Sequence, residues 1–203
     1  MVELKKDLPE IFEEFADQRR NSFLAIKKLK EQGVPVVGAF CTYLPKELPR
    51  AMGAAVVGLC SVSDETIPDA EKDLPRNLCP LIKSSYGFAK TDKCPFFYFS
   101  DLVVGETTCD GKKKAWEILA KDVPLHVMDL PQMKRAKDIK AWAEEIETFK
   151  NVVEEFTGNV VTAEKLAESI KLINNKRKAL ERLYNLRKNE NLPISGCDVL
   201  LIS

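Results

Sequence analysis

Hydrophobic and polar positions divide the chain into short apolar runs and longer stretches with helical spacing. Continuous apolar runs are typical of strands that are buried on both faces, and they occur at residues 34–40, 54–59, 96–104 and 123–128. Helical spacing bounded by Gly or Pro predicts helices at residues 8–32, 46–52, 80–88 and 111–120. The polar segment 61–73 is predicted to be a loop with one helical turn.

Strands that alternate with helices predict a parallel sheet with right-handed crossovers. We therefore expect an α/β protein whose residues 1–131 form a three-layer parallel-sheet domain of the Rossmann or flavodoxin type, with a leading helix. After Pro131, apolar positions advance by three or four residues as far as Gly158, and a second such stripe follows Thr162. This spacing predicts a long helical hairpin over residues 132–190.

The last segment of the chain, residues 191–203, is strongly apolar from Leu192 to Ile202. We interpret it as the start of a second α/β domain that the chain does not contain. On this interpretation the chain is one half of a two-domain protein.

Composition narrows the classes of function. Lys and Arg number 31, as do Asp and Glu, so the formal net charge of zero gives no global electrostatic footprint for nucleic acid. No apolar stretch approaches the roughly 20 residues that span a bilayer, and the charged start lacks the apolar core of a signal peptide. We expect a cytoplasmic protein with neither nucleic acid nor membrane as partner, whose six cysteines are not structural disulfides.

Three of the cysteines are predicted to meet at one edge of the sheet. Cys41 follows the first strand, Cys109 follows the third and precedes a helix, and Cys79 stands at a helix start before Pro80. Binding sites form outside the carboxyl ends of parallel strands, and a helix N-terminus favours a thiolate over a thiol. The three thiols are too far apart in sequence for a local zinc knuckle, so a metal or cluster site would be assembled by the fold.

The other candidate residues have simpler interpretations. Cys60 is assigned to the core, Cys197 to a structural role in the tail, and Cys94 remains a weaker ligand candidate towards the opposite, amino end of the sheet. Ordinary burial of the cysteines remains open. The single histidine, His126, is expected to be a hydrogen-bonded core residue, and surface or capping roles are expected for three further residues near the edge: Glu47, Glu65 and Lys83.

Three sequence blocks carry a resemblance to a known family. They are FCTYLPKE at residues 40–47, LCPLIKSS at residues 78–85 and ETTCDGKKK at residues 106–114. In this order they resemble the 2-hydroxyacyl-CoA dehydratase component D family, which includes benzoyl-CoA reductase type subunits and double-cubane cluster reductases. The resemblance covers nearly the whole chain and includes VMDLP at residues 127–131.

The resemblance implies an iron–sulfur enzyme of anaerobic metabolism. Dehydratases of this family hold a [4Fe–4S] cluster between two α/β domains through three cysteines, which would be Cys41, Cys79 and Cys109 here. The fourth iron position stays open for the acyl-CoA substrate. A separate ATP-dependent activator, itself an iron–sulfur protein, supplies one electron, and a ketyl radical then loses water from the 2-hydroxyacyl-CoA. The subunit would form a homo- or heterodimer with a related subunit, and this chain alone would be incomplete and inactive.

Alternatives remain open at this point. The segment from Cys94 to Phe99 and the pair Thr107–Thr108 are somewhat closer to double-cubane reductases, which reduce small molecules at an [8Fe–9S] cluster. A non-catalytic electron-transfer or cluster-assembly protein is a further alternative. The sequence identifies neither the substrate nor an acid or base residue.

Overall fold

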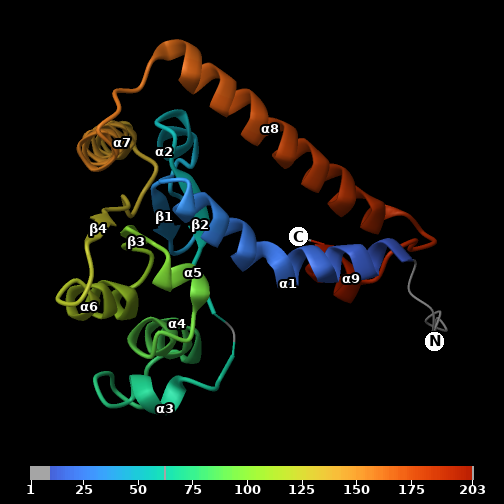
Figure 1. The fold of residues 1–203 in the computed structure, drawn as a ribbon, viewed down its shortest axis with the longest axis horizontal. Helices are drawn as coiled ribbons and strands as arrows, with labels where there is room; N and C mark the ends of the chain where they lie inside the picture. The colour runs from blue at the N-terminus through green and yellow to red at the C-terminus, as the bar shows by residue number, and fades with distance from the viewer. Residues whose placement is uncertain (1–9, 62, 203) are drawn as a thin grey trace.

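A four-stranded parallel sheet forms the centre of the computed structural model, which describes residues 10–61 and 63–202. The strand order is β2-β1-β3-β4 (Figure 1). The strands are β1 (Val36–Ala39), β2 (Ala55–Gly58), β3 (Leu102–Glu106) and β4 (Leu125–Met128). The predicted α/β class with a parallel sheet is confirmed.

Helices cover both faces of the sheet (Figure 1). One face packs against α3 (Ile67–Ala70), α4 (Pro80–Lys90), α5 (Pro95–Tyr98) and α6 (Asp110–Leu119), and the other against α2 (Glu47–Ala51), α7 (Ala136–Thr157) and the start of α8 (Ala163–Asn185). Adjacent strand residues divide between the faces, since Val36 and Val103 pack in the first cluster and Val37 and Val104 in the second. This two-sided burial explains why the strands are continuous apolar runs in the sequence.

The third predicted strand begins later than the sequence suggested. Residues 95–98 form the helical turn α5, and only Leu102–Glu106 is extended. Pro95 has no N–H to give to a sheet and its fixed φ suits a first helical position. The Sγ of Cys94 accepts a hydrogen bond from the Phe97 N–H at 3.4 Å and caps the turn. The prediction of one strand over residues 96–104 was therefore wrong in its first half.

The other strands and short helices predicted before residue 131 are confirmed to within two residues, and the predicted helix over residues 8–32 is α1 (Glu10–Glu31) as far as the described residues reach. In place of the hairpin predicted over residues 132–190, the two long helices α7 and α8 begin at Ala136 and end at Asn185. Gly158 ends α7 in the left-handed conformation with φ 67°, and the Thr162 hydroxyl accepts from the Lys165 N–H at 3.3 Å to begin α8. Both long helices pack against α2, and α8 then extends away from the sheet (Figure 1).

The C-terminal segment forms a short 3-10 turn (Leu186–Lys188) and then α9 (Gly196–Ile202). Helix α9 contacts α1 (Figure 1). Its residue Val199 is buried. The division at residues 131 and 190, and the assignment of the tail to a second domain, stay predictions. In the described part of the chain, no helix is long and apolar enough to cross a membrane.

Candidate functional site

The topology places a crevice between the carboxyl ends of β1 and β3. The chain leaves β1 towards β2 through α2, whereas it leaves β3 towards β4 through α6, so the two connections depart in opposite directions and on opposite faces. Such a switch point leaves an opening above the sheet, where ligands of open α/β proteins bind. Cys41 follows β1 and Cys109 follows β3, so both predicted residues reach this point.

Cys41 lies at the centre of this crevice. Its Sγ is 3.7 Å from the Thr108 Oγ1 and accepts a close contact from the Lys112 ammonium, and its N–H donates to the Cys60 Sγ at 3.4 Å. The pKa of Cys41 is lowered from 9.0 to about 5, first by the side-chain hydrogen bond with Cys60, then by Lys112 and Thr108, all acting against partial burial. Cys41 is therefore a thiolate at neutral pH.

Cys60 is the clearest correction to the sequence interpretation. It was assigned to the core, but it is exposed and lies beside Cys41. Its pKa is raised, chiefly because its thiol donates a hydrogen bond to the Cys41 thiolate. Cys60 follows β2 by two residues, as Cys41 follows β1, and these two strands pair in register. This shared offset was the feature of the sequence that could have placed Cys60 beside Cys41.

We call the carboxyl edge of the sheet that carries Cys41, Cys60 and Cys109 the cysteine edge.

Cys109 and Cys79 occupy equivalent positions at two helix starts. Each is exposed and is the N-cap residue of its helix, Cys109 for α6 and Cys79 for α4. The two helices contact each other, and Gly111 leaves room for the side chains of Leu78 and Ile82, which would lie 2.9 Å from a Cβ there. Cys79 thus stands next to the start of the helix that Cys109 begins.

Lys112 interacts electrostatically with three of the cysteines. Burial lowers the pKa of this ammonium, but the hydrogen bond with Cys41 and the electrostatic interactions with Cys41, Cys60 and Cys109 outweigh that effect and raise it. Within residues 10–61 and 63–202, no three Cys, His, Asp or Glu side chains lie close enough together, as they stand, to hold a metal ion. The fold therefore brings the thiols to one edge without closing them into a ligand set.

The remaining cysteines lie elsewhere. Cys94 caps α5, in the connection that leads into the amino end of β3, and is partly buried against the core. Cys197 is exposed at the start of α9. Neither has a contact with the cysteine edge among the described interactions.

Glu106 is a residue that the sequence interpretation missed. It is the last residue of β3 and is fully buried, and its Oε1 accepts from the Leu44 N–H at 2.7 Å. Burial raises its pKa, and the nearby charge of Cys41 acts in the same direction. A carboxylate that ends an apolar strand, directly before Thr107, was the signal that could have identified it.

The polar residues considered near the edge have structural partners. Glu47 pairs with Arg177, and the exposed Glu65 with Lys93 at 2.7 Å. Lys83 is not a surface residue, since it is buried and pairs with Glu71 at 2.7 Å.

His126 differs from its predicted role as a hydrogen-bonded core residue. Its ring stacks on Phe149 with centroids 5.7 Å apart, but its buried Nε2 has no hydrogen-bond partner and lies 3.9 Å from a Glu145 oxygen. Burial lowers its pKa, so the ring is neutral.

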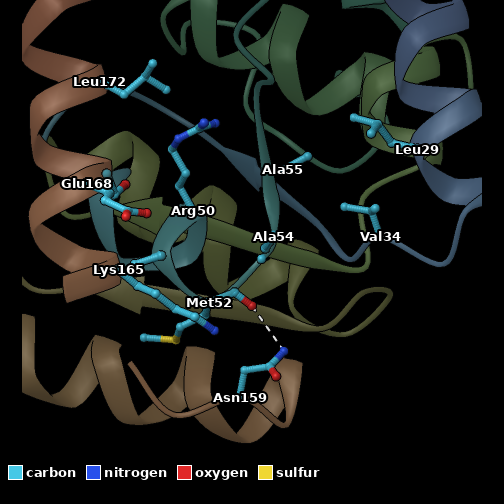
Figure 2. A pocket seen from close by; sticks show the side chains of 13 residues that line it. Leu29, Val34, Arg50, Met52, Ala54, Ala55, Asn159, Lys165, Glu168 and Leu172 are labelled. Carbon is cyan, nitrogen blue, oxygen red and sulfur yellow. Dashed lines mark hydrogen bonds between the residues drawn. The ribbon is translucent and has the colours of Figure 1, made fainter. Parts of the chain in front are cut away.

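Two cavities lie at opposite ends of the sheet. One of about 450 Å³ adjoins the cysteine edge and is lined by Tyr43, Thr108 and Trp142, among others. The other, of about 830 Å³, opens between α1, α2 and α8 beside Val34 and Ala54, near the amino ends of β1 and β2 (Figure 2). Of these two, the first is placed to communicate with the thiols.

Comparison with known proteins shows that the chain matches one protein family. A model of the "2-hydroxyglutaryl-CoA dehydratase, D-component" family matches residues 41–203. The chain is 52% identical over 202 residues to the "Putative dehydratase subunit YjiM" of Escherichia coli (strain K12), a match that covers 99% of this chain and 53% of that protein. It is 22% identical over 188 residues to a benzoyl-CoA reductase subunit of Thauera aromatica, covering 89% of this chain and 48% of that protein. The chain thus spans about half the length of the curated relatives it matches.

Proposed function

The chain belongs to the 2-hydroxyglutaryl-CoA dehydratase D-component family, and we propose that its cysteine edge holds an iron–sulfur cluster in a 2-hydroxyacyl-CoA dehydratase type subunit. The observation that carries the proposal is that Cys41 lies beside Cys60 at the switch point of the sheet, where Cys109 follows β3, with the pKa of Cys41 lowered to about 5. Thiolates are the ligands that iron–sulfur clusters take.

The proposed ligands are Cys41, Cys79 and Cys109. Their chemistry fits a cluster, because Cys79 and Cys109 are exposed at helix N-termini and Lys112 lies where it offsets negative charge. Since no three donors among the described residues are gathered as they stand, binding requires the starts of α4 and α6 to move towards Cys41. When bound, such a cluster supplies one-electron chemistry, and an iron without a cysteine ligand offers a Lewis-acidic position.

The 450 Å³ cavity supports an acyl thioester as the substrate class. Its lining includes the apolar side chains of Leu130, Met133 and Trp142, and it reaches the edge at Thr108. We propose that the acyl part lies in this cavity with the thioester towards the thiols. The electron donor would be an ATP-dependent activator, and a related subunit would complete the enzyme.

Iron and sulfide analysis tests the proposal. Anaerobically reconstituted chain should bind about four irons, and Cys41→Ser, Cys79→Ser and Cys109→Ser should each lose most of them. Cys197→Ser is the matched control, because this exposed cysteine lies on α9 away from the edge, and it should keep its iron. Iron-free protein after anaerobic reconstitution, both of this chain alone and of this chain with its related subunit, would overturn the proposal.

A second candidate function is a double-cubane reductase of small molecules. Cys60 favours it, because it is an additional thiol at the cysteine edge beyond the three proposed ligands and a larger cluster takes more ligands. About eight irons per chain, with loss on Cys60→Ser, would support this candidate over the first. Dehydration of a 2-hydroxyacyl-CoA by this chain with its related subunit and activator would decide for the dehydratase.

A further inference from the structure

The turn that carries Cys41 has an unusual backbone. Cys41 has φ 69°, in the left-handed region that residues other than glycine adopt rarely. Such a conformation persists only when surrounding interactions offset its cost in free energy. The three residues that follow, Thr42 to Leu44, turn back over the end of β3 towards Glu106.

A buried carboxyl group binds an N–H group of this turn. Glu106 is 0% exposed, and its Oε1 accepts from the Leu44 N–H at 2.7 Å, whereas its buried Oε2 has no hydrogen-bond partner among the described residues. The backbone N–H groups of Tyr43 and Thr42 also act to lower the pKa of this carboxyl group, against the effect of burial. Leu44 is three residues after the left-handed Cys41, so this hydrogen bond anchors the turn that Cys41 begins.

The same residue is tied to the helix that Cys109 begins. The Glu106 carbonyl accepts from the Trp116 Nε1–H at 3.0 Å, and the Trp116 ring stacks on Phe40, directly before Cys41, with centroids 4.5 Å apart. Through these contacts Glu106, at the end of β3, connects the Cys41 turn with α6.

We propose that Glu106 is a positioning residue whose carboxylate fixes the Thr42–Leu44 turn and thereby holds Cys41 at the cysteine edge. The importance of this for a cluster rests on the proposed function, since there Cys41 is a ligand. The contact between the carboxylate and the turn does not depend on any bound group.

Hydrogen exchange in the metal-free chain tests the contact directly. In Glu106→Ala, the Leu44 amide should exchange about tenfold faster or more, because its hydrogen bond to the buried Oε1 is lost. The amides of β1 should keep their exchange rates. Glu106→Gln, which retains one acceptor oxygen, should show a smaller acceleration, and Glu117→Ala, which removes an exposed carboxylate on α6, should show none.

A second variant tests the link to the backbone of Cys41. Glycine adopts the left-handed region without cost, so the loss of stability caused by Glu106→Ala should be smaller in a Cys41→Gly background. Unchanged exchange of the Leu44 amide in Glu106→Ala would overturn the proposal. If that variant unfolds, Glu106→Gln decides: if the Leu44 amide does not exchange faster in that variant, the proposal is equally overturned. Since the exchange is measured on metal-free protein, failure here is distinct from failure of wild-type protein to bind iron.

Discussion

Replacing Cys60 by alanine should raise the pKa of Cys41 and move the onset of its reactivity to higher pH. The side-chain hydrogen bond from Cys60 is the largest of the interactions that lower this pKa, ahead of those from Lys112 and Thr108. Without this donor the Cys41 thiolate loses its main stabilising partner, while the burial that favours the neutral thiol remains.

The size of the effect is bounded by two pKa values of Cys41, the lowered value of about 5 and the ordinary value of 9.0. With a pKa of about 5 the thiol is about 99% ionised at pH 7, whereas with the ordinary value of 9.0 it would be about 1% ionised. The rate at a single pH is a poor measure, because thiolates of low pKa are intrinsically weaker nucleophiles. The midpoint of the pH profile is the quantity to measure. It should lie near 5 in the wild type and at least about one unit higher in Cys60→Ala.

The assay is alkylation of the metal-free chain by iodoacetamide under anaerobic conditions, with the Cys41 peptide quantified by mass spectrometry over a range of pH. Thr108→Val is the matched control, since it removes a smaller stabilising interaction and should raise the midpoint less. A wild-type midpoint near 9, or one that Cys60→Ala leaves in place, would refute the pairing of the two thiols.

Three further outcomes are expected. Trp116→Ala should lower the free energy of unfolding by about 3–5 kcal/mol in urea titrations, because it empties a buried site, whereas a loss under about 1 kcal/mol would contradict this packing. Gly87→Ala should cost about 1–3 kcal/mol, since its Cβ would lie 2.2 Å from the Thr66 carbonyl; Gly58→Ala, with open space, is the control, and equal costs would argue against the clash. Burial holds the pKa of His126 below its ordinary 6.5, so the unfolded chain binds the extra proton and stability should fall as pH drops below 6.5. His126→Gln should flatten this dependence in urea titrations at a series of pH values, and an unchanged slope would exclude the effect.

The apolar runs predicted the sheet well because strands covered on both faces leave a local signal. The same reasoning failed at residues 96–99, where aromatic side chains are compatible with a strand or a helical turn. Pro95 and the Cys94 cap favour a helical turn there. Both features are visible in the sequence, but the prediction gave more weight to the apolar run. The predicted strand therefore extended over a helix.

The sequence predicted where the candidate site lies better than it predicted which residues form it. Cys41 and Cys109 were placed at the carboxyl edge from their order after strands, and the structure brings both to the switch point. Cys60 has the same offset but no polar or helix-start neighbours, so it was assigned to the core. Glu106 gave little indication of its role, because its partners are N–H groups of a turn 62 residues earlier in the chain.

Periodicity, caps and motifs are local properties, so the order of residues was enough to establish the α/β class, most helix boundaries and the family. The position of Cys60 beside Cys41, and the hydrogen bond from the Leu44 N–H to the buried Glu106, became apparent only in the folded molecule. Those contacts depend on which strands are neighbours, and strand order arises from packing between segments far apart in the chain.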